Sequence, residues 1–293
     1  METRLKVGQT PMIPLRFDDI TIWGKAEFLN PSGSVKDRPI FNILKRGFEN
    51  GLLKEGDTVV EATSGNAGIS FAMYCAEFKL KCVIVMPSNM SEERKQMLRL
   101  YGAELIEVEA GNFDEAIRLR NELSDKNGWF NGNQFNSEWN VEAHRETTGV
   151  EIIYQCDANC FYPEAFVAGT GTGGTLMGVG DVLENYLPNT KLVAVEPAES
   201  PVMSGGEPGL HGIQGIGDGS KFMVDLSRVS RVITISTDEA KEMVSKLSKD
   251  FGLFIGISGA ANVLGSLKYA QETNSKNIVT ILCDRGERYL SCL

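Results

Sequence analysis

The sequence predicts an α/β protein of two domains, built on mostly parallel, twisted sheets with helices on both faces. Three observations lead to this fold class. Short apolar runs alternate with segments of helical periodicity along most of the 293 residues. The predicted strands are apolar at nearly every position, as in parallel sheets that are buried on both sides. The chain length suits two domains or one large α/β unit.

The first half of the chain alternates strands with helices. We expect strands at 57–62, 81–87 and 103–109. We expect helices at 66–78, 91–102 and 112–126. The second of these helices begins at Ser91, has Glu93 in its first turn and ends near Gly102, which are the usual start and stop signals.

The second half repeats the alternation. We expect strands at 165–169, 191–197, 231–236 and 277–283. Helices are expected after the "TGGT" ending at Thr175, at 237–252, and after Ser258. Residues 198–230 form one long irregular stretch, and loops of that length in a compact domain tend to be functional or mobile.

Composition excludes several classes of function. The formal net charge is −10 and no Lys/Arg-rich run occurs, so nucleic acids and anionic membranes are poor partners. The N-terminus lacks a secretory signal, and no apolar run reaches the ~18 residues of a membrane helix. With six scattered cysteines, this favours a reducing cytoplasm.

Metal and triad chemistry are also disfavoured. Cys156 and Cys160 are four residues apart, but no second ligand pair follows, and His144 and His211 lie far away in sequence. We therefore expect no metal site. The scarcity of histidine and the absence of a G-x-S-x-G motif argue against a Ser-His-Asp hydrolase.

Three polar or glycine-rich turns each follow a predicted strand and open a predicted helix: "EATSGNAG" (61–68), "AGTGTGGT" (168–175) and "GISGAAN" (256–262). In open α/β sheets, ligands bind outside the carboxyl ends of the strands. A helix N-terminus adds unpaired N–H groups and a positive dipole end. These turns are therefore candidate ligand-binding loops.

The turn "GTGTGGT" carries the strongest anion signal. Gly171, Gly173 and Gly174 remove side chains near the backbone, and Thr172 and Thr175 add hydroxyl donors, which suits a phosphate. The pattern is not an ATP P-loop and only loosely matches a dinucleotide motif. The alternative is a tight turn without a ligand.

The turn "TSGN" offers the hydroxyls of Thr63 and Ser64 and the amide of Asn66. These groups could donate to a carboxylate and to a phenolate-like oxygen. Because Ser, Thr and Asn are also preferred helix caps, the motif is weak by itself.

Lys36 lies in "NPSGSVKDRP" (30–39), where Ser34 could cap a helix and Lys36 would fall in its first turn. The positive dipole end disfavours a charged ammonium there. That suits an amine that must be neutral to form a Schiff base. Taken alone, a solvated surface lysine is the commoner explanation.

Asp218 lies in "HGIQGIGDGS" (211–220), a turn with four glycines. The glycines let the backbone approach a ligand closely, and Asp218 adds one carboxylate to that backbone. Aspartate is also a common turn residue. Asp218 is therefore either an acid/base beside a bound ligand or a turn residue that faces solvent.

The motifs "NPSGSVKDR", "TSGN", "GTGTGGT", "GEPGLHGIQGIG" and "DRGERYLS" occur in this order. With them the chain, from about Gly8 to Ser291, resembles the cysteine synthase (O-acetylserine sulfhydrylase) and cystathionine β-synthase group of fold type II pyridoxal-phosphate enzymes. The resemblance implies a fold like that of the tryptophan synthase β-subunit and a homodimer. It implies a smaller, mobile domain at 31–138, and a larger, cofactor-anchoring domain made of 1–30 and 139–293.

The resemblance also implies roles for single residues. Lys36 would hold pyridoxal 5'-phosphate as an internal aldimine and then act as general base and acid. Asn66 would bind the ring oxygen, Gly171, Thr172, Gly173, Gly174 and Thr175 the phosphate, and Ser258 the pyridine nitrogen. Thr63, Ser64 and Gln134 would grip the substrate α-carboxylate, with Gly215 also at the substrate. A neutral Ser258 makes a weaker electron sink than an acid, which suits β-replacement.

Two positions depart from the family pattern: Ile257 replaces the first serine of the usual "SSG", and Asp218 replaces a small apolar residue. Cys283 instead resembles one sulfhydrylase branch that carries a cysteine near the ring, where it either lines the cofactor pocket or is an inert buried thiol. The main hypothesis is cysteine synthesis from O-acetylserine and sulfide through an aminoacrylate. An alternative is cysteine plus water giving serine and sulfide, with Asp218 activating the water, and a short cystathionine β-synthase is a third. A catalytically silent relative that binds a partner is disfavoured by the intact Lys36, Asn66 and phosphate loop.

Overall fold

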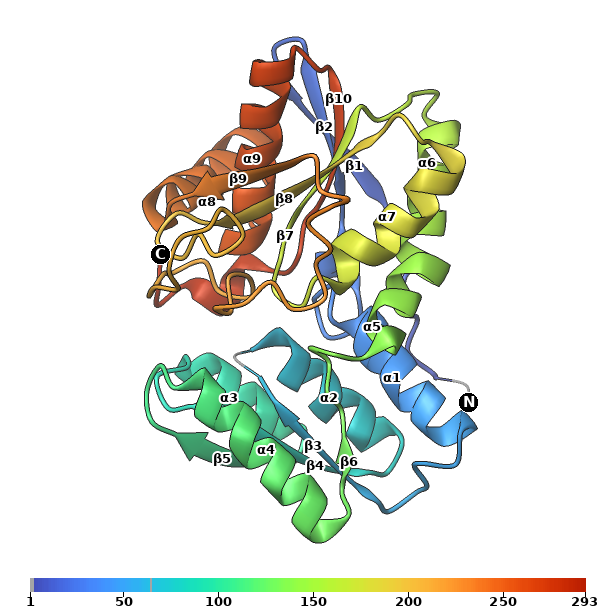
Figure 1. The fold of residues 1–293 in the computed structure, drawn as a ribbon, viewed down its shortest axis with the longest axis vertical. Coiled ribbons are helices and arrows are strands. Elements are labelled where there is room, and N and C mark those ends of the chain that lie inside the picture. The colour runs from blue at the N-terminus through green and yellow to red at the C-terminus, as the bar shows by residue number, and fades with distance from the viewer. Residues whose placement is uncertain (1–2, 64) are drawn as a thin grey trace.

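The structure, a computed structural model, describes residues 3–63 and 65–293, and within these residues the strands form two sheets. Figure 1 shows them one above the other, each covered by helices. We call the six-stranded sheet with its helices the upper unit and the four-stranded sheet with its helices the lower unit. The predicted α/β fold class is confirmed.

The upper sheet has the strand order β1-β2-β10-β7-β8-β9. Its strands are β1 (Met12–Phe17), β2 (Ile20–Lys25), β7 (Ala165–Gly169), β8 (Lys191–Pro197), β9 (Arg231–Ile235) and β10 (Asn277–Ile281). The hairpin of β1 and β2 is antiparallel, and all other pairings are parallel. The N-terminal hairpin thus extends a sheet that is otherwise made by the second half of the chain.

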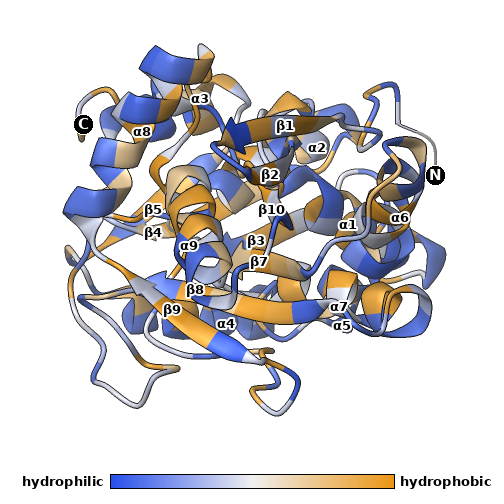
Figure 2. Cartoon of the chain, turned by 90° about the horizontal axis from the view of Figure 1, so that it is seen from above, coloured by the Kyte–Doolittle hydropathy of each residue, from blue (hydrophilic) through white to orange (hydrophobic). Residues whose placement is uncertain are grey.

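Both faces of the upper sheet are buried. Alternate residues such as Val167 and Val193 pack on α8 (Thr237–Phe251) and α9 (Ile257–Thr273). Their neighbours Phe166 and Leu192 pack on α6 (Val150–Ala158) and α7 (Gly174–Tyr186). Figure 2 shows β7 and β8 as hydrophobic, whereas hydrophilic residues cover much of α8. This burial explains the continuous apolar runs of the sequence.

The lower sheet is parallel throughout and has the order β5-β4-β3-β6. Its strands are β3 (Thr58–Ala62), β4 (Lys81–Pro87), β5 (Glu104–Val108) and β6 (Phe130–Asn131). One face packs on α1 (Asp37–Glu49), α2 (Asn66–Glu77) and α3 (Glu92–Leu100) through residues such as Val59. The other face packs on α4 (Phe113–Asn127) through residues such as Val60.

One helical segment connects the two units. It consists of α5 (Glu138–Ala143), the π-helical turn η2 (His144–Gly149) and α6. Figure 1 shows α5 beside α1 at the junction of the units. Short 3-10 turns lie at η1 (Glu27–Leu29) and η3 (Gly286–Tyr289). The domain division at residues 31 and 138 stays a prediction.

A buried charge network fixes the start of α1. Arg38 binds Glu27 through Nε at 2.6 Å and Glu151 through Nη1 at 2.7 Å, and Lys25 Nζ reaches Glu151 Oε2 at 2.6 Å. Two cations face two carboxylates, and each charge has a partner, as buried charges require. Because Arg38 lies two residues after Lys36, this network holds the backbone that carries Lys36.

Most predicted elements occur within one or two residues of the expected bounds, and β4, β7 and β8 have the expected bounds. Lys36 is an exception, because it is the residue before α1, which begins at Asp37. The hairpin β1–β2 and the helices α5 and α6 had no counterpart in our predictions. In the described part of the chain, no helix has the length and apolar character needed to cross a bilayer.

Candidate active site

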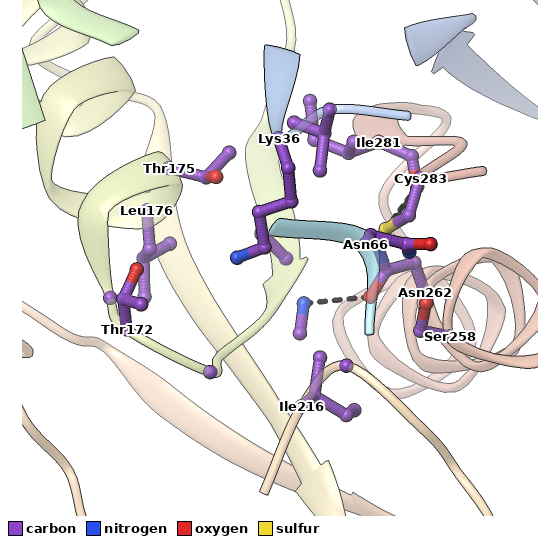
Figure 3. A pocket seen from close by; sticks show the side chains of 16 residues that line it. Lys36, Asn66, Thr172, Thr175, Leu176, Ile216, Ser258, Asn262, Ile281 and Cys283 are labelled. Carbon is purple, nitrogen blue, oxygen red and sulfur yellow. Dashed lines mark hydrogen bonds between the residues drawn. The ribbon is translucent and has the colours of Figure 1, made fainter. Parts of the chain in front are cut away.

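A central cavity lies between the two units, and Figure 3 shows it. Lys36 comes from the residue before α1, Asn66 from the first turn of α2, and Ser258 from the first turn of α9. The loop 171–175 before and at the start of α7 forms another wall, and Cys283 follows β10. The structure therefore brings together residues that lie up to 247 positions apart in the sequence.

The loop 171–175 is shaped to bind an anion. Gly173 has φ +86, a conformation that favours glycine, and a Cβ on Gly174 would clash with Asn140 Oδ1. A Cβ on Gly171 would lie 2.8 Å from the carbonyl oxygen of Gly215. Helix α7 begins at Gly174, so the N–H groups of its first turn face this loop. Both the space and the dipole suit a phosphate group.

The two threonine hydroxyls of this loop have protein partners. Thr172 Oγ1 accepts from Asn140 Nδ2 at 3.0 Å and from the backbone N–H of Gly174 at 3.3 Å. Thr175 Oγ1 lies 3.2 Å from His144 Nε2. Asn140 and His144 belong to α5 and η2, so the connecting helix supports the loop from behind.

Lys36 extends into the central cavity, as Figure 3 shows. Burial lowers the pKa of its amine, and the nearby carboxyl of Asp218 partly opposes that change. A lowered pKa increases the fraction of neutral amine, which is the nucleophilic form. The geometry thus fits an amine that attacks a carbonyl carbon.

Asn66 is held by groups of the upper unit. Its Nδ2 donates to Asp284 Oδ2 at 2.6 Å, and its Oδ1 accepts from Arg288. Tyr289 donates to the same Asp284 oxygen, while Arg288 also donates to the backbone oxygen of Ser32. These bonds fix both ends of the Asn66 amide and tie α2 to the segment after β10.

Ser258, Cys283 and Asn262 form the far end of the cavity (Figure 3). Asn262 donates to the backbone oxygen of Ile281 at 2.8 Å and contacts Cys283 Sγ at 3.4 Å, and it accepts from the N–H of Gly169. Burial raises the pKa of the Cys283 thiol to about 12. Cys283 therefore stays a neutral thiol in the cavity wall.

A side cavity adjoins the central one and shares Lys36, Asn66, Thr172 and Gly215 with it. Its further lining residues are Thr63, Gly65, Ala67, Arg94, Gln134, Phe135 and Asp218. Thr63 and Gln134, which the sequence predicted to grip a substrate carboxylate, line this one cavity together, and that role stays a prediction. The prediction for Ser64 falls outside the described residues.

Asp218 lines the side cavity together with Lys36, rather than pointing only to solvent. Its Oδ2 would lie 3.1 Å from a Cβ on Gly171, which places the carboxyl at the edge of the anion loop. Burial raises its pKa, and the positive charge of Lys36 opposes that shift. A carboxyl with a raised pKa can both accept and donate a proton closer to neutral pH.

Sequence reasoning missed several residues of the site. Arg94 lines the side cavity with its guanidinium carbon 5.0 Å from the centroid of the Tyr289 ring. Asn262, four residues after Ser258, is on the same helix face, and that spacing was a usable signal. Arg94 had no such signal, because its helix α3 belongs to a different part of the sequence from every motif.

The described residues contain no group of three or more side chains suited to hold a metal ion. They do contain an amine with a lowered pKa, an anion loop and donors between the two. This donor set fits pyridoxal 5'-phosphate, which carries one phosphate and one aldehyde. Lys36 could hold its aldehyde carbon, the loop 171–175 its phosphate, and Ser258 its ring nitrogen.

Comparisons with known proteins agree with this site. Residues 3–284 match the family described as "Pyridoxal-phosphate dependent enzyme". The chain is 41% identical to a cysteine synthase of Staphylococcus aureus strain Mu50, over 97% of this chain and 94% of that protein. It is similar to the crystal structure of a cysteine synthase from Entamoeba histolytica, with 37% identity, a TM-score of 0.90, and coverage of 98% of this chain and 88% of that one.

It is also similar to a hydrogen sulfide-producing enzyme from Fusobacterium nucleatum, with 37% identity, a TM-score of 0.93, and coverage of 98% and 88%. An aspartate-to-asparagine mutant of that enzyme is solved with an α-aminoacrylate intermediate. The match spans nearly the whole chain and includes the lysine, the glycine loop and both sheets. The chain therefore belongs to the pyridoxal-phosphate-dependent enzymes, as a β-replacement enzyme of the cysteine synthase group.

Proposed function

We propose that this enzyme synthesises cysteine by replacing the acetate of O-acetylserine with sulfide. The proposal is carried by one arrangement of residues around the two joined cavities. The buried amine of Lys36 lies at both cavities, the glycine loop 171–175 lines the central cavity, and Thr63 and Gln134 line the side cavity. The curated relative with 41% identity is a cysteine synthase, which supports cysteine as the product, and a similar solved structure is an O-acetylserine sulfhydrylase, which supports the substrate pair. The bound cofactor supplies an electron sink that eases loss of a proton from Cα and of a group from Cβ.

The residues of the chain divide the remaining work. Lys36 would hold the cofactor and would move a proton at Cα, since burial lowers the pKa of its amine. Asn66 positions the ring oxygen with an amide that Asp284 and Arg288 keep fixed. Ser258, a neutral hydroxyl, leaves the ring nitrogen without a carboxylate partner, which favours elimination and replacement over transamination.

Thr63 and Gln134 bind the α-carboxylate of the amino acid. Thr63 is 3% exposed and Gln134 is 2% exposed, so both are largely withdrawn from water. Helix α2 starts beside Thr63 and points its N-terminus at the side cavity, which favours an anion there. Lys36 and Asp218 line the same cavity, so an amino acid held there would lie beside both groups.

A second candidate is favoured by Asp218. Its carboxyl lines the side cavity next to Lys36, and burial raises its pKa, so it can take a proton from an attacking water. The reaction would convert cysteine and water to serine and hydrogen sulfide. The structurally similar hydrogen sulfide-producing enzyme, whose aspartate-to-asparagine mutant is solved with α-aminoacrylate, supports this alternative.

The first experiment compares the two directions. Purified enzyme loaded with pyridoxal phosphate is given O-acetylserine with sulfide, or cysteine alone, and cysteine, serine and sulfide are measured over time. Faster cysteine formation supports the main proposal, and faster sulfide release with equal serine supports the second. No turnover in either mixture contradicts both.

The second experiment isolates Asp218. With cysteine as substrate, Asp218→Asn should release sulfide about once per active site and then stop before serine forms, because the water is not activated. Asp125→Asn, which changes an exposed carboxyl on α4 outside both cavities and the outer groove, is the matched control and should behave as wild type. Serine formation at the wild-type rate in Asp218→Asn would make Asp218 a structural turn residue.

We also propose a cytoplasmic homodimer with a mobile smaller domain at 31–138. The six cysteines are free thiols, which suits a reducing compartment. Leu290 and Leu293 are 65% and 48% exposed near the C-terminus, and such apolar groups suit an interface. Light scattering after size-exclusion chromatography measures the assembly, and a monomer mass would contradict the dimer.

A further inference from the structure

Three phenylalanine rings form a cluster where the two units meet. Phe113 is the first residue of α4, and Phe135 directly follows Gln134, so both belong to the lower unit. Phe222 belongs to the long loop of the upper unit. The ring centroids of Phe113 and Phe135 are 5.4 Å apart, and those of Phe135 and Phe222 are 4.7 Å apart. Phe135 is thus the central ring of the cluster.

The cluster lies between two spaces. Phe135 lines the side cavity described above. Phe113 and Phe222 line an outer groove, which is bounded by 111–114 of the lower unit and by Ser200, 208–210 and 217–220 of the upper unit. Asp218 lines both the side cavity and the groove. The groove therefore ends at the outer side of the aromatic cluster, and the substrate region begins at its inner side.

The loop that carries Asp218 and Phe222 is anchored at both ends. The N–H of Gly217 donates to the backbone oxygen of Thr170 at 3.0 Å, and the N–H of Met223 donates to that of Thr172 at 3.2 Å. Thr172 belongs to the anion loop 171–175, and Thr170 directly precedes it. Phe222 has φ 43, a left-handed conformation that non-glycine residues rarely adopt. The upper unit thus fixes Phe222 in place by the same loop that would hold the phosphate.

Phe135 is positioned from the opposite side. The N–H of its neighbour Gln134 donates to Glu61 Oε2 at 3.1 Å, and Glu61 is fully buried in β3. Gln134 and Phe135 both line the side cavity, so the wall of that cavity continues directly into the ring that contacts Phe222.

We propose that Phe113, Phe135 and Phe222 form an aromatic gate between the outer groove and the side cavity, and that this gate selects the second substrate by size. Hydrogen sulfide and water pass the closed rings beside Asp218, whereas thiols with longer carbon chains are excluded. This inference rests on the proposed β-replacement. It adds the three rings that decide which nucleophile reaches the β-carbon. Phe222 is the best position for a substitution, because its side chain is half-buried and it lies in a loop.

The test follows the second half-reaction in the holoenzyme. O-Acetylserine, or cysteine if that is the better substrate, is added first. Loss of the Cβ group leaves an intermediate, and its visible absorbance is followed until it no longer increases. Sulfide, methanethiol or 2-mercaptoethanol is then mixed in, and the decay of that absorbance is timed. In wild type, the decay rate falls steeply from sulfide to 2-mercaptoethanol. In Phe222→Ala, the rate with 2-mercaptoethanol relative to sulfide rises about tenfold or more.

Two further variants accompany this test, a second gate variant and a control outside the gate. Phe113→Ala removes a ring from the other side of the gate and should change the ratio in the same direction. Phe251→Ala removes a ring that packs on Phe17 with centroids 5.1 Å apart, between β1 and α8, and should leave the wild-type ratio. A second readout is quenching of the bound cofactor's fluorescence by acrylamide, which should be stronger in Phe222→Ala than in wild type or Phe251→Ala.

The outcomes separate the gate from the proposed function. An unchanged size ratio and unchanged quenching in both gate variants would overturn the gate. If no intermediate forms in wild type, the proposed function fails, and acrylamide quenching alone decides whether the rings close the cavity. If Phe222→Ala does not fold, the ratio in Phe113→Ala decides.

Discussion

Replacing Glu61 by glutamine gives a strong test of how the fold positions the substrate site. Glu61 is fully buried in β3, and Arg120 of α4, 2% exposed, binds its Oε1 at 2.8 Å. The same oxygen accepts from the N–H of Ala62, and Oε2 accepts from the N–H of Gln134. Glu61 therefore joins a buried cation to the backbone of the substrate loop.

Glu61→Gln disturbs both the ion pair with Arg120 and the hydrogen bond from the backbone of Gln134. Arg120 loses its carboxylate, and breaking a buried ion pair from one side costs about 3–5 kcal/mol of unfolding free energy. If the new amide oxygen faces Arg120, its NH2 group faces the N–H of Gln134, so two donors oppose each other. One lost hydrogen bond of about 1.4 kcal/mol at Gln134 corresponds to a roughly tenfold rise in KM for the amino acid.

Three measurements are needed. Urea unfolding gives the loss of stability, steady-state kinetics give KM, and visible titration gives the cofactor affinity, which should change little because Glu61 lines neither cavity. Glu115→Gln is the matched control, since it breaks an exposed pair with Arg118 on the same helix as Arg120. An unaltered KM in Glu61→Gln, with reduced stability, would refute the positioning role and leave a purely structural one.

Three other predictions follow from single groups. Burial raises the pKa of Glu151, but the hydrogen bonds and charge of Arg38 outweigh it and lower the pKa to about 2. The stability from ionised Glu151 is therefore full above its unfolded pKa of about 4.3 and is lost as pH falls toward 2, so acid unfolding of Glu151→Gln should show about 3 kcal/mol less pH dependence. Burial lowers the pKa of Lys36 and the charge of Asp218 partly opposes that shift, so the pH profile of cofactor uptake in Asp218→Asn should move to lower pH, as stopped-flow absorbance measures. Gly174→Ala should weaken cofactor binding by about 1–3 kcal/mol in visible titrations, because its Cβ has no room at the anion loop.

The strands and the ligand loops could be predicted from sequence for local reasons. Runs such as 81–87 and 191–197 are apolar at nearly every position because both faces of each sheet are covered. The turns after β3 and β7 were recognisable because parallel strands direct their carboxyl ends to one edge. Both inferences needed only neighbouring residues.

The rest depended on contacts between distant parts of the chain. The bonds from Asn66 to Asp284 and Arg288 span 218 and 222 positions, and no local pattern indicates them. The hairpin β1–β2 was missed because Pro14 and Arg16 interrupt an apolar run at the edge of the sheet. Lys36 lies one residue before α1, so the expected first-turn position was wrong by one residue.

Asp218 shows the same limit at the site. Its sequence context allowed either a solvent-facing turn or a group at the substrate. The structure puts it in the wall of the side cavity because Gly217 binds back to Thr170 and brings the loop over the anion site. That hydrogen bond joins residues 47 positions apart and has no sequence signature. The role of Asp218 in proton transfer stays a prediction.

The most direct test of the account is to locate the lysine that holds the cofactor. The protein is loaded with pyridoxal phosphate, treated with borohydride to make the link permanent, digested, and mapped by mass spectrometry. The account predicts the modification on Lys36 alone, with loss of the visible absorbance band in Lys36→Ala. Modification of another lysine, or the full band in Lys36→Ala, would contradict it.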